Sequence, residues 1–293
     1  NHNTAPVEIR EQVAYAGDEV ARALERLMAV DGIDEALLLS TCNRTEFYVV
    51  GNGQAHESLK GWLTATRRLD DGFHDSLFSL EEADAIRHIF RVACGLDSMV
   101  LGEPQILGQL KDAWRVAQES GALGSDLGRL MQHTFSVAKK VRTDTEIGSS
   151  PVSVAYAAVH MAQQFYSSFK KQTAILVGAG VTIDLVAKHL KRKEIGRLFI
   201  ANRNLDRARN LAHDYGGYAL PLSELAGSLQ EADILISSTG SPSAVVTEAM
   251  VREAQASRRR RPLFAVDIAV PRDIDPGVGK LRDVYLYTID DLN

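Results

Sequence analysis

Four short apolar runs recur through the second half of the 293-residue sequence, and stretches with helical periodicity separate them. Runs without polar interruption are typical of parallel strands that helices cover on both faces. Strands and helices that alternate in this way predict a doubly wound α/β domain built on a parallel sheet. The runs occupy 174–177, 198–200, 234–236 and 263–266.

The first half of the sequence mixes short strands with long helices. Apolar runs at 36–39 and 47–50 predict two strands, and the polar residues between them place Cys42 at a bend. Further on, Ile86, Ile89, Phe90 and Ala93 form a stripe at helical spacing, which predicts a core-facing helix.

The chain is long enough for two domains. We therefore expect an α/β protein in two parts: an N-terminal α+β catalytic domain at 1–148 and a Rossmann-like domain at 149–293. The Gly-Ser-Ser-Pro segment at 148–151 marks the boundary, and a helix at 153–169 leads into the second domain.

The composition excludes several classes of protein. The net charge is −5, so any contact with nucleic acid must come from a local basic patch. Two cysteines and no paired metal-ligand spacing indicate neither a disulfide scaffold nor a metal site. No apolar run reaches the roughly 20 residues of a membrane span, and no leader pattern is present. We expect a cytoplasmic protein with reduced thiols.

A glycine-rich turn follows the first strand of the second half and opens a helix. In that context Gly178 permits a tight turn, and Gly180 lets the backbone approach a pyrophosphate. A turn used only for strand–helix packing is the alternative, since the third glycine position holds Ile183. The predicted cofactor-binding residues of the turn are Gly178, Ala179, Gly180, Val181, Thr182 and Ile183.

The end of the next strand indicates which dinucleotide would bind. An NAD site usually has a carboxylate there for the ribose 2′-hydroxyl, whereas this chain has Asn202 and Arg203. Arg203 can pair with a 2′-phosphate, which favours NADPH. Thr239 and Gly240 follow the run at 234–236, where a nicotinamide would lie.

Cys42 has polar neighbours on both sides, including Arg44, whose charge favours the reactive thiolate. A small packed turn residue is an equally good interpretation of Cys42 from composition alone. Cys94 lies beside the predicted core stripe and is interpreted as structural. A reactive thiol could form a thioester with the substrate, and a hydride donor could then reduce this thioester to an aldehyde.

Long motifs in the sequence resemble the glutamyl-tRNA reductase family. The resemblance runs through nearly the whole chain and is most specific at 95–109, which reads GLDSMVLGEPQILGQ. The other matching segments are 40–46 (STCNRTE), 137–142 (VAKKVR), 267–272 (DIAVPR) and 287–292 (YTIDDL).

The resemblance implies a role for individual residues. Cys42 would form the thioester, and His88, which periodicity alone predicts to be a solvated helix histidine, would support activity. The residues from Gly178 to Ile183 would bind NADPH, although Val181 stands where the family commonly has Glu. The implied substrate-binding residues are Thr41, Asn43, Arg44, Ser98, Glu103, Pro104, Gln105 and Gln109.

The implied reaction is the reduction of glutamyl-tRNA(Glu) to glutamate-1-semialdehyde, the first step from glutamate to 5-aminolevulinate and porphyrins. Glutamate-1-semialdehyde aminomutase is a further candidate partner. Lys139, Lys140 and Arg142 are candidates for phosphate contacts, and surface solvation explains them equally well. The family continues into a C-terminal dimerisation domain that this sequence lacks, so we expect a weakened homodimer.

Two other functions remain open from the sequence. A free-carbonyl NADP dehydrogenase of the shikimate-dehydrogenase type would share the cofactor domain and would be indifferent to thiol alkylation. A non-enzymatic fragment that binds tRNA or a partner would form no acyl group on Cys42.

Overall fold

The computed structural model describes residues 1–67, 69, 71–98, 102–103, 105–145, 147, 154–258 and 261–292, without the side chains of 71, 72 and 74. The chain divides into two compact units, Asn1–Val152 and Ser153–Asn293, and each is considered by itself. The predicted boundary between 148 and 149 lies outside the described residues, as does Pro104.

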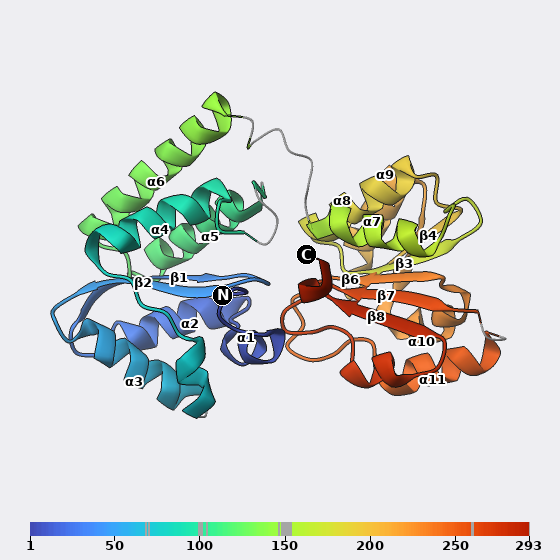
Figure 1. Ribbon diagram of the computed structural model, residues 1–293, viewed down its shortest axis with the longest axis horizontal. Helices are drawn as coiled ribbons and strands as arrows, with labels where there is room; N and C mark the ends of the chain where they lie inside the picture. Colours follow the sequence, from blue (N-terminus) through green and yellow to red (C-terminus); the bar gives the residue numbers. More distant parts are fainter. Residues whose placement is uncertain are drawn as a thin grey trace. The chain divides into compact units, whose positions relative to one another are not determined.

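The first unit contains a two-stranded antiparallel sheet (Figure 1). Strand β1 (Ile33–Ser40) pairs with β2 (Thr45–Gly51), and Leu38 lies opposite Phe47. These strands confirm the two apolar runs. Residues 36–39 are all buried because helices cover both faces of β1.

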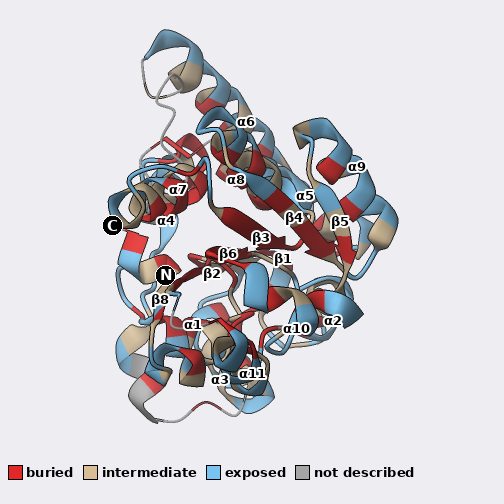
Figure 2. Cartoon of the chain, turned by 90° about the vertical axis from the view of Figure 1, so that its right-hand side faces the viewer, coloured by how far each residue is buried: buried red, intermediate tan, exposed pale blue. Residues whose placement is uncertain are grey.

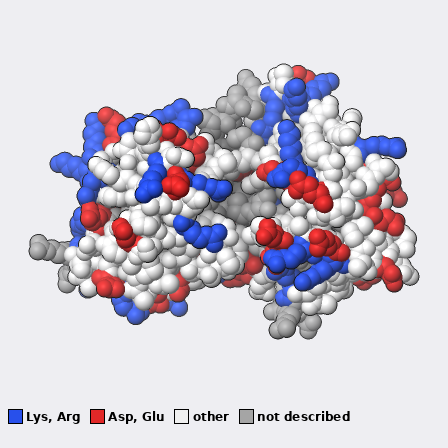
Figure 3. All heavy atoms as spheres, turned by 180° about the vertical axis from the view of Figure 1, so that it is seen from behind, with Lys and Arg blue, Asp and Glu red and all other residues white. Residues whose placement is uncertain are grey.

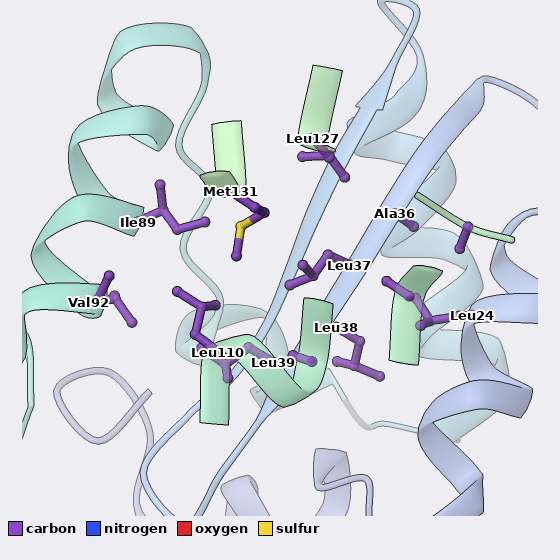
Figure 4. Packing of buried hydrophobic residues seen from close by; sticks show 14 of the residues in the cluster. Leu24, Ala36, Leu37, Leu38, Leu39, Ile89, Val92, Leu110, Leu127 and Met131 are labelled. Carbon is purple, nitrogen blue, oxygen red and sulfur yellow. The ribbon is translucent and has the colours of Figure 1, made fainter. Parts of the chain in front are cut away.

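Helices enclose this sheet from two sides. In Figure 1, α4, α5 and α6 lie on one side of the sheet and α1, α2 and α3 on the other. Figure 4 shows the resulting core, in which Leu37 and Leu39 lie toward Met131 and Leu110, and Leu38 lies toward Leu24. The helices are α1 (Val7–Val13), α2 (Asp18–Leu27), α3 (Ala55–Arg67), η1 (Asp71–Ser76), α4 (Glu82–Cys94), α5 (Gln105–Glu119) and α6 (Ser125–Asp144).

The predicted core stripe of α4 is wrong at one end. Ile89 and Ala93 are fully buried, but Ile86, in the first turns of the helix, is 42% exposed. Cys94 is buried in the same core, in agreement with a structural role. Gly95 ends α4 in the left-handed conformation that glycine adopts without strain.

A buried carboxylate fixes the start of α6. The oxygens of Glu35 on β1 accept hydrogen bonds from the backbone N–H groups of Asp126 and Leu127 at 3.0 and 2.7 Å. These are first-turn donors that have no partner within the helix. The sheet therefore sets the position of α6 through a charged cap as well as through packing.

The second unit contains a six-stranded parallel sheet in the order β5-β4-β3-β6-β7-β8. This confirms the doubly wound α/β fold, since the strand order reverses between β3 and β6. Figure 2 shows the central strands as the buried layer of this unit. The strands are β3 (Thr173–Val177), β4 (Arg197–Asn202), β5 (Tyr218–Pro221), β6 (Ile234–Ser237), β7 (Leu263–Asp267) and β8 (Val284–Thr288).

Helices lie on both faces of this sheet, with α7, α8 and α9 on one face and α10 and α11 on the other (Figure 1). The helix expected to reach 169 ends at Phe165, because the hydroxyl of Tyr166 donates to the Asp233 and Pro262 carbonyls and ties the chain to the sheet. The helices are α7 (Val154–Phe165), α8 (Val181–Arg192), α9 (Leu205–Tyr215), η3 (Leu222–Glu224), α10 (Leu225–Ser228), η4 (Leu229–Glu231), α11 (Glu248–Ser257), η5 (Pro276–Lys280) and η6 (Ile289–Leu292).

None of the helices in the described part of the chain combines the length and the apolar character needed to cross a membrane.

Candidate active site

Cys42 lies in the short loop that joins β1 to β2. The hydroxyl of Thr41 accepts hydrogen bonds from the backbone N–H groups of Asn43 and Arg44, both at 3.2 Å. The Thr41 N–H donates to the Arg44 carbonyl at 2.8 Å and closes the loop. The predicted bend is confirmed, and Thr41 is the residue that shapes it.

Two residues from the N-terminal segment hold the loop from outside. Arg10, which is 3% exposed, donates through Nη1 to the Cys42 carbonyl at 2.5 Å. The backbone N–H of His2 donates to the Asn43 carbonyl at 2.9 Å. Arg10 lies far from the loop in sequence and carries no motif of its own, so the sequence alone gave no indication of this contact.

The thiol itself is in an unfavourable setting for ionisation. Cys42 is partly buried, and burial raises the pKa of its thiol to about 12. The negative charge of Glu103 acts in the same direction, while Arg10 and Arg44 favour the thiolate without overcoming it. Arg44 favours the thiolate, as predicted from the sequence, but burial outweighs it and the pKa of Cys42 remains raised.

Arg44 is the centre of a buried ion-pair network. Its side chain is 1% exposed, and Nη1 donates to Glu46 Oε1 at 2.6 Å. Its Nη2 donates to the carbonyl of Asp97 and to Asp97 Oδ1, the latter at 3.2 Å. A guanidinium has five N–H donors, so the bonds to the described residues do not use all the donors of Arg44. Arg44 therefore lies in the Cys42 loop and forms ion pairs with two acidic residues of the same unit, Glu46 and Asp97.

Glu46 is the carboxylate that balances this arginine. Burial by itself would raise the pKa of Glu46, but the hydrogen bond with His88 and the charge of Arg44 outweigh it and lower that pKa to about 2. Tyr48 adds a third contact, its hydroxyl donating to Glu46 Oε2 at 2.5 Å. Burial and the charge of Glu46 in turn raise the pKa of Tyr48. The network therefore holds Glu46 ionised throughout the physiological range.

His88 on α4 belongs to the same network. Its Nε2 lies 3.1 Å from Glu46 Oε1, and its Nδ1 lies 3.9 Å from Asp97 Oδ2. Only 12% of the side chain is exposed, and the ring packs edge-on against Phe78 at 5.4 Å between centroids. The interpretation of His88 as a solvated helix residue is wrong, because the strand β2 presents a carboxylate to this face of α4.

The segment between α4 and α5 approaches the loop from another side. Glu103 is 7% exposed, and burial raises the pKa of its carboxyl group. Ser98 follows Asp97, the residue that pairs with Arg44. Gln105 and Gln109 lie four residues apart on α5, on one face of its first turns, and both are partly exposed. The fold thus gathers sequence-predicted residues from two separate motifs.

One buried polar atom in the loop has no internal partner. Asn43 is 5% exposed, and its side-chain Oδ1 accepts no hydrogen bond from the described residues. A buried carbonyl oxygen without a donor is costly, by about 1–3 kcal/mol. This atom is available to a donor on a bound molecule.

In the second unit, the glycine-rich turn joins β3 to α8 at the point where the strand order reverses. Gly178 has φ +113°, and a Cβ there would meet the Ser238 carbonyl oxygen at 2.3 Å. Gly178 is therefore required by the close approach of two loops. At Gly180 the position of a Cβ has no atom within 4 Å, so this side of the turn is open.

Helix α8 begins immediately after the turn, with Gly180 as its N-cap residue. The first intrahelical bond runs from Asp184 N–H to the Gly180 carbonyl, which leaves the N–H groups of Val181, Thr182 and Ile183 without helical partners. The Val181 side chain is 68% exposed, whereas Ile183 is fully buried under the sheet. Ile183 replaces the third glycine as a core residue, and the open amides fit a phosphate.

The end of β4 presents the other predicted cofactor residues. Asn202 uses its Nδ2 to donate to the Asn204 carbonyl at 2.9 Å, which shapes the turn into α9. Arg203 is exposed and forms no ion pair with any residue that the structure describes. A free guanidinium at this position fits a 2′-phosphate.

The end of β6 is held by an acid that the sequence did not single out. Asp273 is fully buried, and its Oδ2 accepts hydrogen bonds from the Ser237 hydroxyl and the Thr239 N–H, both at 2.7 Å. The Thr239 hydroxyl donates to Oδ1 of the same carboxyl group. Burial raises the pKa of Asp273, and it raises that of the neighbouring Asp267 to about 7. Asp267 ends β7 and begins the DIAVPR motif, and Asp273 directly follows that motif. The motif was therefore the sequence feature that could have pointed to both acids.

Within the described residues, no group of three or more His, Cys, Asp or Glu side chains is arranged to hold a metal ion.

Substitution of Glu46 by Gln tests the ion-pair network. The pKa of Glu46 in the folded chain, about 2, lies below its ordinary value of 4.5, so its charge stabilises the fold above pH 4.5 and this stabilisation is lost as the pH falls toward 2. We expect E46Q to lower the unfolding free energy of the first unit by roughly 2–4 kcal/mol at pH 7. Between pH 5 and pH 3 its stability should fall less than that of the unsubstituted chain.

Urea unfolding followed by tryptophan fluorescence measures this effect, because both tryptophans, Trp62 and Trp114, lie in the first unit. Glu57→Gln is the matched control, since the Glu57 side chain is 77% exposed. Equal stability of E46Q and the control at pH 7, or parallel acid profiles, would contradict the role of Glu46.

Comparison with known proteins matches both units of the chain. Residues 1–145 match the family described as glutamyl-tRNAGlu reductase, N-terminal domain, and residues 160–293 match shikimate / quinate 5-dehydrogenase. The glutamyl-tRNA reductase of Methanopyrus kandleri, a solved structure, is 36% identical with a TM-score of 0.49, over 99% of this chain and 70% of that one.

Curated relatives are more similar still. The glutamyl-tRNA reductase of Xanthomonas axonopodis pv. citri is 54% identical over 292 residues, which is 100% of this chain and 67% of that protein. That of Alkalilimnicola ehrlichii is 54% identical over 293 residues and 66% of its length. The chain thus spans about two thirds of the length of these relatives. By this identity over its whole length, the chain belongs to the glutamyl-tRNA reductase family.

Proposed function

We propose that the chain reduces glutamyl-tRNA(Glu) to glutamate-1-semialdehyde with NADPH, through a thioester on Cys42. The observation that carries this proposal is the position of Cys42 in a loop that Thr41 and Arg10 hold rigid. Around it the fold collects Arg44, Asn43 and Glu103, which can bind the charged and polar groups of a glutamyl ester.

The first step would be attack of the Cys42 sulfur on the ester carbonyl carbon. A C–S bond forms, the C–O bond to the terminal ribose breaks, and the thiol proton must reach the leaving oxygen. Because burial raises the pKa of Cys42 to about 12, the proton leaves as the new bond forms and not beforehand. Glu103, whose own pKa is raised, is the group that we propose accepts this proton and returns it to the ribose oxygen.

Recognition of the glutamyl group would use the remaining donors and acceptors of the loop. Arg44 would bind the side-chain carboxylate with N–H donors other than those bound to Glu46 and Asp97. The unpaired Oδ1 of Asn43 can accept from an ammonium group. His88 forms its hydrogen bond with Glu46 and none with Cys42 among the described residues, so we assign it first to positioning Glu46 and Arg44.

The second unit would hold the nicotinamide cofactor. The open amides at the start of α8 would fit its pyrophosphate. Arg203, which forms no ion pair within the described part of the chain, favours NADPH because it can bind a 2′-phosphate. Thr239 and Gly240 at the end of β6 would face the nicotinamide. When bound, NADPH supplies the hydride that converts the thioester into an aldehyde and restores the thiol.

A free-carbonyl dehydrogenase remains the second candidate, because residues 160–293 match shikimate / quinate 5-dehydrogenase. Such an enzyme would bind its cofactor with the second unit in the same way, and the Cys42 loop would take no part in the reaction. The two functions therefore differ in whether activity requires the thiol.

The decisive variant is Cys42→Ser. We expect the unsubstituted chain, incubated with glutamyl-tRNA(Glu) without NADPH, to gain the mass of one glutamyl group on the peptide that contains Cys42. C42S should give no thioester and at least a thousandfold less aldehyde. Intact-mass and peptide-mass measurements check the adduct, and Cys94→Ser is the control because Cys94 is buried in the core. Full reductase activity in C42S would refute the thioester.

Substitution of Asp273 by Asn tests the end of β6. Asparagine keeps one acceptor oxygen and replaces the other with an NH2 group, so one of the two hydroxyls, that of Ser237 or that of Thr239, loses its acceptor. We expect the KM for NADPH to rise about tenfold, which corresponds to about 1.4 kcal/mol, while acylation of Cys42 in the other unit is unchanged. Asp275→Asn, which affects the cap of η5, is the control. An unaltered KM in D273N would show that Asp273 does not position the cofactor.

A further inference from the structure

A groove of about 520 Å³ runs between α5 and α6 in the first unit, and the mechanism proposed above makes no use of it. Lys111 and Leu107 line it from α5, and Phe135, Lys139 and Arg142 line it from α6. In Figure 3, lysine and arginine side chains gather at the upper right, over the C-terminal part of α6.

The groove is strongly basic for a chain of net charge −5. Its lining carries three cationic side chains and, among the described residues, no carboxylate. Lys111 and Lys139 are exposed, and neither forms an ion pair with any residue that the structure describes. Cationic side chains that form no ion pair with the described residues make a local site for a polyanion.

Arg142 links the groove to the thiol. Its Nη2 donates to the Glu103 carbonyl at 2.7 Å, and the charge of Glu103 acts directly on Cys42. The Nε of Arg142 is buried and has no acceptor among the described residues. A buried cationic donor without an acceptor is costly, and a phosphate oxygen would satisfy it.

The floor of the groove is aromatic. The Phe135 ring packs edge-on against Trp114 at 6.1 Å between centroids, which fixes its orientation. Lys111 Nζ lies 5.8 Å from the Phe135 centroid. An aromatic ring flanked by unpaired cations is the arrangement that binds single-stranded nucleic acid, since bases stack on the ring while phosphates meet the cations.

We propose that this groove binds the unpaired 3′ strand of the tRNA, with its phosphates on Lys111, Lys139 and Arg142 and a base on Phe135. The inference rests on the proposed function, because the glutamyl ester at the end of this strand must reach Cys42. The groove gives the strand a course that ends beside Glu103. The same contacts would let the chain bind the RNA before any covalent step.

The test measures binding of the full chain to an unacylated RNA hairpin that copies the acceptor stem of tRNA(Glu) with its unpaired 3′ strand. A second hairpin lacks that strand. Lys139→Glu is compared with Lys140→Glu, which makes the same charge change at the next residue of α6. Lys140 is also exposed and is also a candidate for phosphate contacts from the sequence, but it lies outside the groove lining. Phe135→Leu removes the stacking surface and keeps an apolar side chain.

We expect K139E to weaken binding of the first hairpin about tenfold and to reduce the slope of log K against log salt by about 0.7, the contribution of one single-strand phosphate. K140E should change the affinity less than twofold, and F135L should weaken it about fivefold. None of the variants should affect the hairpin that lacks the 3′ strand.

Equal effects of K139E and K140E, or equal losses with both hairpins, would overturn the proposal, since they would indicate only a general attraction. Acylation of Cys42 is scored separately with a small glutamyl thioester that carries no RNA. If that reaction fails while the groove variants behave as expected, the thioester mechanism is wrong and the proposed RNA binding by the groove is supported. If the reaction succeeds while K139E binds RNA normally, only the proposal that the groove binds RNA is wrong.

Discussion

The first unit depends on the buried ion pair between Arg44 and Glu46. A buried charge is tolerated only when it is paired and hydrogen-bonded, and here each member has further partners in Asp97, His88 and Tyr48. Because these partners come from β2, from α4 and from the loop after α4, the network joins three segments at one point. The Cys42 loop leads directly into β2 and contains Arg44, so the position of the thiol depends on the pairing of the arginine two residues later.

In the second unit, backbone geometry and one buried acid position the loops that follow β3 and β6. Gly178 brings the turn after β3 within contact of the Ser238 carbonyl, and Asp273 fixes the end of β6 through two side chains and one N–H group. The first N–H groups of α8 have no helical partner, and no atom lies within 4 Å of the position of a Cβ on Gly180. The first unit thus holds the Cys42 loop with a charged network, and the second unit forms a backbone turn that would suit a dinucleotide.

Sequence patterns predicted much of this architecture, because buried strands and the glycine turn have local signatures. The apolar runs, the bend at Cys42 and the parallel sheet follow from residues close together in the chain. Contacts between distant residues were not predictable in this way. Arg10 on the Cys42 carbonyl, Glu46 beside His88 and Asp273 beneath Thr239 each require the fold to be known. His88 shows the limit most clearly, since its place on α4 indicated solvent while β2 supplied a partner.

We propose that Cys42 is held as a neutral thiol and acts as a nucleophile only as its proton is passed on. The most direct test is the rate of alkylation of Cys42 by iodoacetamide as a function of pH, read from the mass of the peptide that contains it. With a pKa of about 12, the rate should still be rising at pH 10 without a plateau. A plateau reached below pH 9 would show a thiol with an ordinary or lowered pKa and would contradict the claim.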